Sequence, residues 1–182
     1  MTSIALQTFA HAIQDATDLL NHFDRINQQP PPPEAEVLKR ASLVMALAAL
    51  ETYVEDRISE AADSVAGAGN DSSRLVSFYR ESLRNDLKYF HTPTTDRIKM
   101  IFQKYLGIDV TEGWCWNNFD SVRARAELNK VAKKRGDIAH RSWRPVAGQP
   151  SPHAVTREEL RKTIRFVIDL VEATDKFLAQ KI

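Results

Sequence analysis

The chain has 182 residues, 43% of them apolar and 27% charged, and its net charge is only +1. Its single cysteine, Cys115, excludes an internal disulfide, and with no recognisable signal peptide this favours a reducing, cytoplasmic location. The longest strongly apolar run, residues 41–50, is too short to cross a bilayer, so we expect no membrane association.

The first predicted helix covers residues 3–27, because its apolar residues recur at steps of three and four. The run QQPPPP, residues 28–33, ends this helix, since proline cannot continue it, and forms a rigid connector. A long second helix follows over residues 34–65. Its middle, ASLVMALAAL, is apolar on all sides, which predicts the central helix of the core.

Two shorter helices are predicted next. Residues 72–90 have an apolar side typical of a third helix, and the sequence HTPTTD ends it. Thr94 or Thr95 caps a fourth helix that runs to residue 106, where Gly107 closes it. The following stretch, IDVTEGWCWNNF, is rich in aromatic residues and is predicted to be a loop.

The last two helices complete the predicted fold. Asn118 or Asp120 caps a fifth helix, and Thr156 with Glu159 forms a capping box for the sixth, which ends near residue 179. We therefore expect a single all-α domain, a bundle of five to six helices. Residues 1–33 supply its N-terminal helix and connector, and residues 34–180 supply its core.

The small net charge conceals an uneven distribution. Residues 1–65 carry ten acidic and four basic residues, whereas residues 121–144 carry eight basic and two acidic residues. The basic segment is either a patch that attracts phosphate groups or a segment that neutralises the charge of the acidic N-terminal half, within one chain or across a dimer. Charge alone does not separate these two interpretations.

The sequence KKRGDIAHRS, residues 133–142, lies inside the basic segment. On a helical wheel of about 100° per residue, the apolar neighbours within roughly 60° of Arg135 are Leu128, Val131, Ala132, Ile138 and Ala139. Arg135 therefore lies at the centre of the stripe predicted to face the bundle, where an arginine without a partner is very costly. His140 falls about 140° from Arg135, and Asp137 points away from it.

Glu51 is the expected partner of Arg135. It lies on the apolar stripe of the second helix, where an amphipathic pattern would place an apolar residue. Two opposite charges at core positions of separate helices are most simply explained if they meet. A buried pair of this kind is compatible with a purely structural role.

His140 favours a functional role of Arg135 over a purely structural one, because histidine titrates near neutrality and this one follows Arg135 by five residues. Histidine and arginine together suffice to cleave RNA through the ribose 2′-hydroxyl. The histidine moves a proton, and the arginine stabilises the charged phosphorane. No group of residues has metal-ligand spacing, so no metal or other cofactor is predicted.

RGDIAH, residues 135–140, resembles the Arg-x4-6-His motif of the HEPN superfamily, helical domains that include many metal-independent ribonucleases. LVMALAALETYVEDRI, FHTPTTDRIKMIFQKYLGID and LNKVAKKRGDIAHRS, followed by a final helix, are similar in order and character to the RiboL-PSP type of HEPN domain. The resemblance covers roughly residues 34–179. It implies a homodimer in which two motifs, each with Arg135 and His140 as its invariant pair, form one composite RNA-cleaving cleft.

The leading hypothesis is therefore a HEPN endoribonuclease that acts as a toxin or defence effector, with an antitoxin or a nucleotidyltransferase-like protein as a partner to look for. The catalytic candidates are Arg135, His140, Glu51 and Asp137. The RNA-binding candidates are Lys133, Lys134, Arg141 and Arg144.

Two alternatives remain open. Many HEPN members carry Asn, Asp or His directly after the arginine, where this chain has Gly136, and this departure is the basis for a non-catalytic module that binds RNA or protein. The other alternative is a structural protein in which the pair of Arg135 and Glu51 only fixes the helix register.

Some further side chains have less specific interpretations. Trp114, Trp116 and Phe119 either stack on bases, line a dimer surface or, as we favour, cover the core. His91 is expected to cap or stabilise the turn before Pro93.

Overall fold

The computed structural model describes residues 2–28, 32–67, 74–141 and 154–182. In this part of the chain it contains six α-helices and one short 3-10 helix, and no strand. The elements are α1 (Ile4–Ile26), α2 (Pro33–Gly67), α3 (Arg74–Leu87), α4 (Thr95–Leu106), η1 (Val110–Gly113), α5 (Ser121–Arg141) and α6 (Arg157–Ala179). The predicted all-α fold is confirmed.

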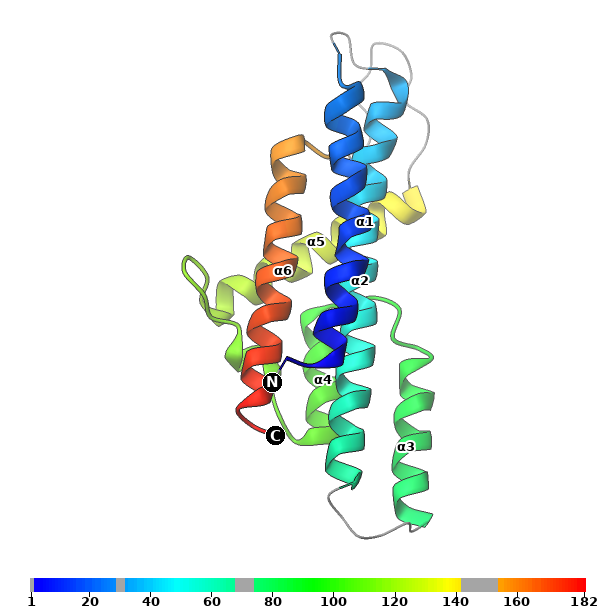
Figure 1. The fold of residues 1–182 in the computed structure, drawn as a ribbon, viewed down its shortest axis with the longest axis vertical. Helices are drawn as coiled ribbons and strands as arrows, with labels where there is room; N and C mark the ends of the chain where they lie inside the picture. The colour runs from blue at the N-terminus through cyan, green and yellow to red at the C-terminus, as the bar shows by residue number, and fades with distance from the viewer. Residues whose placement is uncertain (1, 29–31, 68–73, 142–153) are drawn as a thin grey trace.

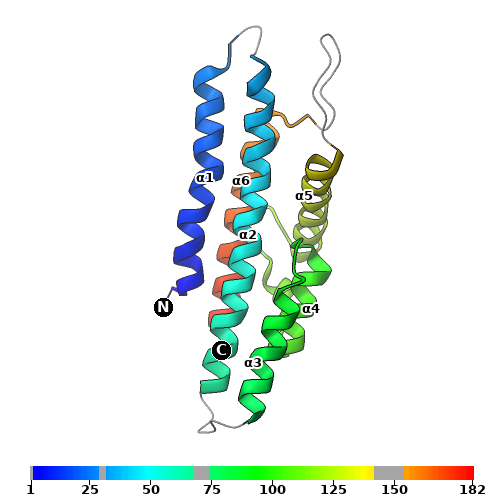
Figure 2. The ribbon, with the colours of Figure 1, turned by 90° about the vertical axis from the view of Figure 1, so that its right-hand side faces the viewer.

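Three long helices, α1, α2 and α6, run side by side along the long axis of the molecule (Figures 1 and 2). α3 and α4 lie against the C-terminal half of α2, and α5 crosses α2 obliquely. α2 contacts all five other α-helices, and Leu43, Leu47 and Leu50 in its apolar middle are at most 2% exposed. The prediction that this helix is central is therefore confirmed.

Helix capping accounts for most of the predicted boundaries. Ser3, Thr94 and Thr156 precede α1, α4 and α6, and their hydroxyl oxygens accept from the amide three residues later at 3.0, 3.4 and 3.1 Å. Gly107 ends α4 with a φ of 71°, a left-handed conformation that glycine adopts without strain. The structure adds η1 within the stretch predicted to be a loop.

A buried ion pair joins α2 to α6. Arg57 Nε donates to Asp175 Oδ1 at 2.9 Å, and the two side chains are only 6% and 7% exposed. The same carboxylate accepts from the hydroxyl of Ser3, the N-cap of α1, and from Tyr53 at 3.5 Å. This cluster therefore fastens α1, α2 and α6 together at one point in the core.

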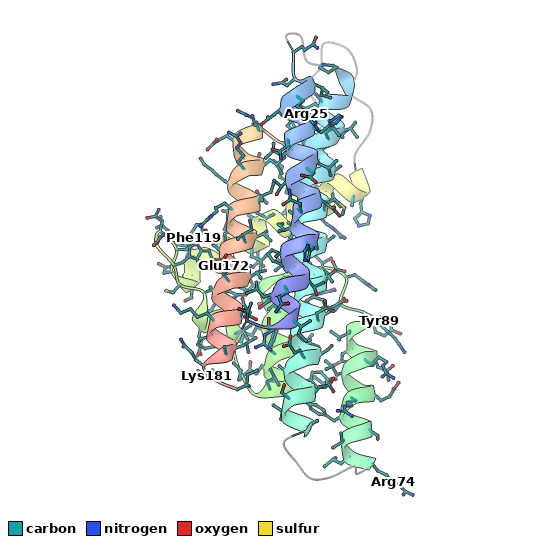
Figure 3. The ribbon with its side chains drawn as sticks, in the orientation of Figure 1. Arg25, Arg74, Tyr89, Phe119, Glu172 and Lys181 are labelled. Carbon is teal, nitrogen blue, oxygen red and sulfur yellow. The ribbon has the colours of Figure 1, made fainter. Side chains whose placement is uncertain are left out.

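The aromatic segment before α5 packs on the bundle, as favoured from the sequence. Trp114 is fully buried, and its indole nitrogen donates to Thr174 on α6 at 2.9 Å. The rings of Trp116 and Phe119 lie 5.1 Å apart and both contact Phe166 of α6. Figure 3 shows Phe119 and Tyr89 on opposite sides of the molecule, so this aromatic cluster is remote from the α3–α4 connection.

None of the helices in the described ranges combines the length and the apolar character that a membrane-spanning segment needs.

Candidate functional site

The candidate site lies where the C-terminal half of α5 crosses α2. α5 starts after Asp120, whose carboxylate accepts from the amide of Arg123 at 2.8 Å. Its middle is fixed on the bundle by Leu128 and Val131, which are 0% and 5% exposed. The helix then continues beyond the long helices, so its C-terminal end projects from the same side of α2 as the α3–α4 connection (Figures 1 and 2).

Arg135 lies on the inward stripe of α5, three residues before the buried Ile138. Arg135 itself is half-buried rather than fully enclosed. Its Nε atom is nevertheless covered by protein and finds no hydrogen-bond acceptor within the described residues. A covered donor without a partner is costly, and no acceptor in the described residues fixes the guanidinium of Arg135 through this atom.

Glu51 is half-buried on α2. Burial raises the pKa of its carboxyl above 4.5, against the opposing attraction of Arg135, His91 and Arg97. The structure therefore brings Glu51 and Arg135 into the same electrostatic neighbourhood. In the described part of the chain, however, no hydrogen bond and no ion pair within 4.0 Å joins them, so the direct contact expected from the sequence is not formed.

His91 and Arg97 are residues near Glu51 that sequence reasoning did not assign to the site. His91 is exposed on the α3–α4 connection, and the N-cap of α4 is Thr94 instead. Arg97 lies in the first turn of α4, and one of its terminal nitrogens donates to the carbonyl of Tyr89 at 3.4 Å. No local pattern links these residues to Glu51, since they meet only through the packing of α4 on α2.

Two hydrogen bonds fix this part of α4 against α5. The amide of Thr95 donates to the side-chain oxygen of Asn129 at 3.0 Å, and its hydroxyl donates to the carbonyl of Arg125, also at 3.0 Å. Both acceptors belong to α5, within the three turns before Arg135. The position of the α3–α4 connection relative to the motif helix is therefore set by direct bonds.

A second carboxylate lies one turn after Glu51 on α2. Glu55 is half-buried, and burial together with the charges of Glu51 and Asp56 raises its pKa above 4.5. α2 is therefore partly covered on this side too, whereas the neighbouring Asp56 is exposed.

The rest of the motif lies at the end of α5. His140 is exposed, and Asp137 is half-buried with its carboxylate accepting from Lys133 at 3.0 Å. A β-carbon placed on Gly136 would meet no atom within 4 Å, so the space beside Arg135 is open. Among the described residues, Gly136 therefore has room for a larger side chain.

The predicted RNA-binding residues differ in their surroundings. Lys133 is exposed, but Lys134 is half-buried and donates to Glu159 of α6 at 2.5 Å, so it is not the free cation that the sequence suggested. The side chain of Arg141 and the whole of Arg144 lie outside the described residues. Across the described ranges, no three His, Cys, Asp or Glu side chains are grouped closely enough to hold a metal ion.

Comparison with known proteins gives one match. A family model described as RiboL-PSP-HEPN matches residues 11–180, from within α1 to the end of α6. No curated protein and no solved structure matches the chain.

Proposed function

The chain belongs to the RiboL-PSP-HEPN family, and from this membership and the surroundings of Arg135 we propose that it is an endoribonuclease that cleaves RNA through the ribose 2′-hydroxyl without a metal ion. The observation that carries the proposal is the half-buried guanidinium of Arg135, which lies near Glu51 and whose Nε finds no acceptor within the described residues. A phosphate oxygen is the acceptor that a guanidinium binds best.

In the proposed reaction, the 2′-oxygen attacks the adjacent phosphorus while its proton passes to His140. The bond between phosphorus and the 5′-oxygen then breaks, and this oxygen takes up a proton. The products are a 2′,3′-cyclic phosphate and a 5′-hydroxyl end. Arg135 stabilises the charge that builds up on the phosphorane, and Glu51 orients Arg135 through the field between them.

A second copy of the chain is part of the proposal. The two proton transfers need a base and an acid, and α5 supplies one exposed histidine, His140, in its motif. A homodimer that brings two ends of α5 together would provide both groups in one composite cleft. The projection of this end beyond the long helices supports such an arrangement (Figure 2).

The test is cleavage of single-stranded RNA in the presence of a chelator. Wild type should give products with 2′,3′-cyclic phosphate ends, and Arg135→Ala and His140→Ala should each lower the rate by about 10²-fold or more. His11→Ala, at an exposed histidine on α1, is the matched control and should cleave normally. If the wild type cuts nothing, or if both site variants cut like the control, the proposed activity is wrong.

A non-catalytic RNA-binding module is the second candidate, favoured by the open space at Gly136, which leaves no polar side chain directly after Arg135. Salt-sensitive RNA binding without turnover would identify this case. Gly136→Asn then provides a direct comparison, because the helix has room for the side chain. A gain of cleavage in this variant would show that only the missing polar group separates the binding module from the enzyme.

The biological setting completes the proposal: a cytoplasmic toxin or defence effector whose target is cellular or foreign RNA. Its single cysteine, Cys115, is exposed and suits a reducing compartment. An adjacent gene for a small antitoxin or for a nucleotidyltransferase-like protein would support this setting. Growth arrest on expression, relieved by coexpressing that neighbour and absent in His140→Ala, is the corresponding measurement.

A further inference from the structure

We propose that Arg97 and His91 extend the site beyond the motif helix, so that Arg135, Arg97 and His91 form one cationic face that binds the backbone of a single RNA strand at more than one phosphate. This inference rests on the proposed function and assigns a phosphate-binding role to two residues outside the motif.

These three side chains converge from three different elements. Arg135 comes from α5, Arg97 from the first turn of α4, and His91 from the connection before it. All three lower the pKa of the Glu51 carboxyl electrostatically, so each of them lies near this carboxyl on α2. Figure 1 shows the α3–α4 connection below the projecting end of α5, on the same side of α2.

Hydrogen bonds and buried neighbours hold the elements that carry Arg97 and His91 in place. The two hydrogen bonds of Thr95 to α5, at 3.0 Å each, fix the start of α4, and Phe90 and Pro93 on either side of His91 are buried. The backbone that carries His91 is therefore anchored while its imidazole remains exposed. A fixed backbone with an exposed side chain favours binding, because little further ordering is needed.

Arg97 has guanidinium N–H donors that can bind a ligand. Its side chain is exposed, and the bond to the Tyr89 carbonyl, at 3.4 Å, is long and engages one of the five N–H donors of a guanidinium. A phosphate in front of Arg97 would give it charge-assisted bonds without loss of the helix.

The carboxylates fit this assignment. Glu51 and Glu55 are half-buried behind the cationic groups, and burial raises the pKa of both. Their side chains are therefore less accessible to an incoming phosphate than the exposed side chains of Arg97 and His91. The outward groups of the site are the exposed Arg97, His91 and His140.

The experiment measures binding of a short single-stranded RNA with 2′-O-methyl riboses, which cannot be cleaved, over a range of salt concentrations. Arg97→Gln should weaken binding about tenfold and lower the slope of log K against log salt by about 0.7, the value for one lost contact to a single-strand phosphate. Arg84→Gln, at an exposed arginine of α3 paired with Glu81, is the matched control and should leave the slope unchanged. Arg97→Lys keeps the charge and should retain most of the slope.

His91→Ala should also weaken binding several-fold, whereas His11→Ala should not. Circular dichroism of each variant shows whether the helices are intact. If folded Arg97→Gln has the same salt slope as Arg84→Gln, the inference is overturned even when the wild type cleaves RNA. If the wild type binds this RNA but cuts no ordinary RNA, the enzyme proposal fails, and the Arg97 comparison still decides the binding face. If the wild type binds no RNA, both fail.

Discussion

Replacing Asp175 with alanine would leave the guanidinium of Arg57 buried without its anionic partner. The side chain of Arg57 is only 6% exposed, so water cannot take over the lost interaction. Removing one member of a buried ion pair costs about 3–5 kcal/mol. In a chain of this size, that corresponds to a fall of roughly 6–20 °C in Tm.

The assay is urea and thermal unfolding followed by far-UV circular dichroism. Asp63→Ala provides the comparison, because Asp63 pairs with Arg80 at a similar 2.8 Å but with side chains 62% and 50% exposed. An exposed pair contributes about 0–1 kcal/mol, so this variant should unfold almost like the wild type. The two substitutions remove the same chemical group and differ in burial.

A double variant tests how much of the lost stability comes from the unpaired charge of Arg57 and how much from the lost packing of Asp175. Arg57→Met combined with Asp175→Leu replaces the pair by apolar side chains and should recover the part of the stability that the lone charge costs, whereas Ser3 and Tyr53 still lack their acceptor. The reasoning is refuted if Asp175→Ala costs no more than Asp63→Ala, since burial would then not decide the strength of the pair.

Three further predictions concern the site and the 3-10 helix η1 before α5. Because burial raises the pKa of Glu51, the folded state favours its protonated form, and stability is lost as the pH rises through the folded pKa. Glu51→Gln should therefore give a small gain in the urea midpoint at neutral pH that disappears below about pH 4; an equal gain at all pH values would contradict this. Gly136→Ala should stabilise α5 by about 0.5–1 kcal/mol, because its β-carbon meets open space. Gly113→Ala should destabilise by about 1–3 kcal/mol, because its β-carbon would overlap the ring of Phe177; thermal unfolding showing the same sign for both glycines would disprove the packing argument.

Local sequence signals were sufficient for the helices and most of their ends. The N-caps Ser3, Thr94 and Thr156 each act within one turn, so their effect is visible in a few consecutive residues. The same holds for the glycine at the end of α4 and for the apolar middle of α2. The helical wheel also predicted that Arg135 lies on the inward stripe of α5, but not that its side chain is only half-buried.

Features that depend on how helices cross were not predictable. Asp175 meets Arg57 across 118 residues of sequence, and nothing near either residue marks it as buried. The approach of Arg97 and His91 to Glu51 depends on the packing of α4 against α2 and α5. The direct contact expected between Arg135 and Glu51 is not formed in the described residues for the same reason. A helical wheel predicts which face of a helix a residue lies on, but not how far that face is from a neighbouring helix.

The oblique course of α5 separates the residues that keep the chain folded from those that meet a ligand. The long helices α1, α2 and α6 are fastened at the Asp175 cluster, whereas His140 is exposed near the end of α5 and a β-carbon on Gly136 would meet no atom within 4 Å. Substitutions at these two positions cost little folding free energy, so selection can alter them almost independently of the scaffold. A domain built in this way can gain, lose or redirect an activity through one or two surface changes, while its architecture stays the same.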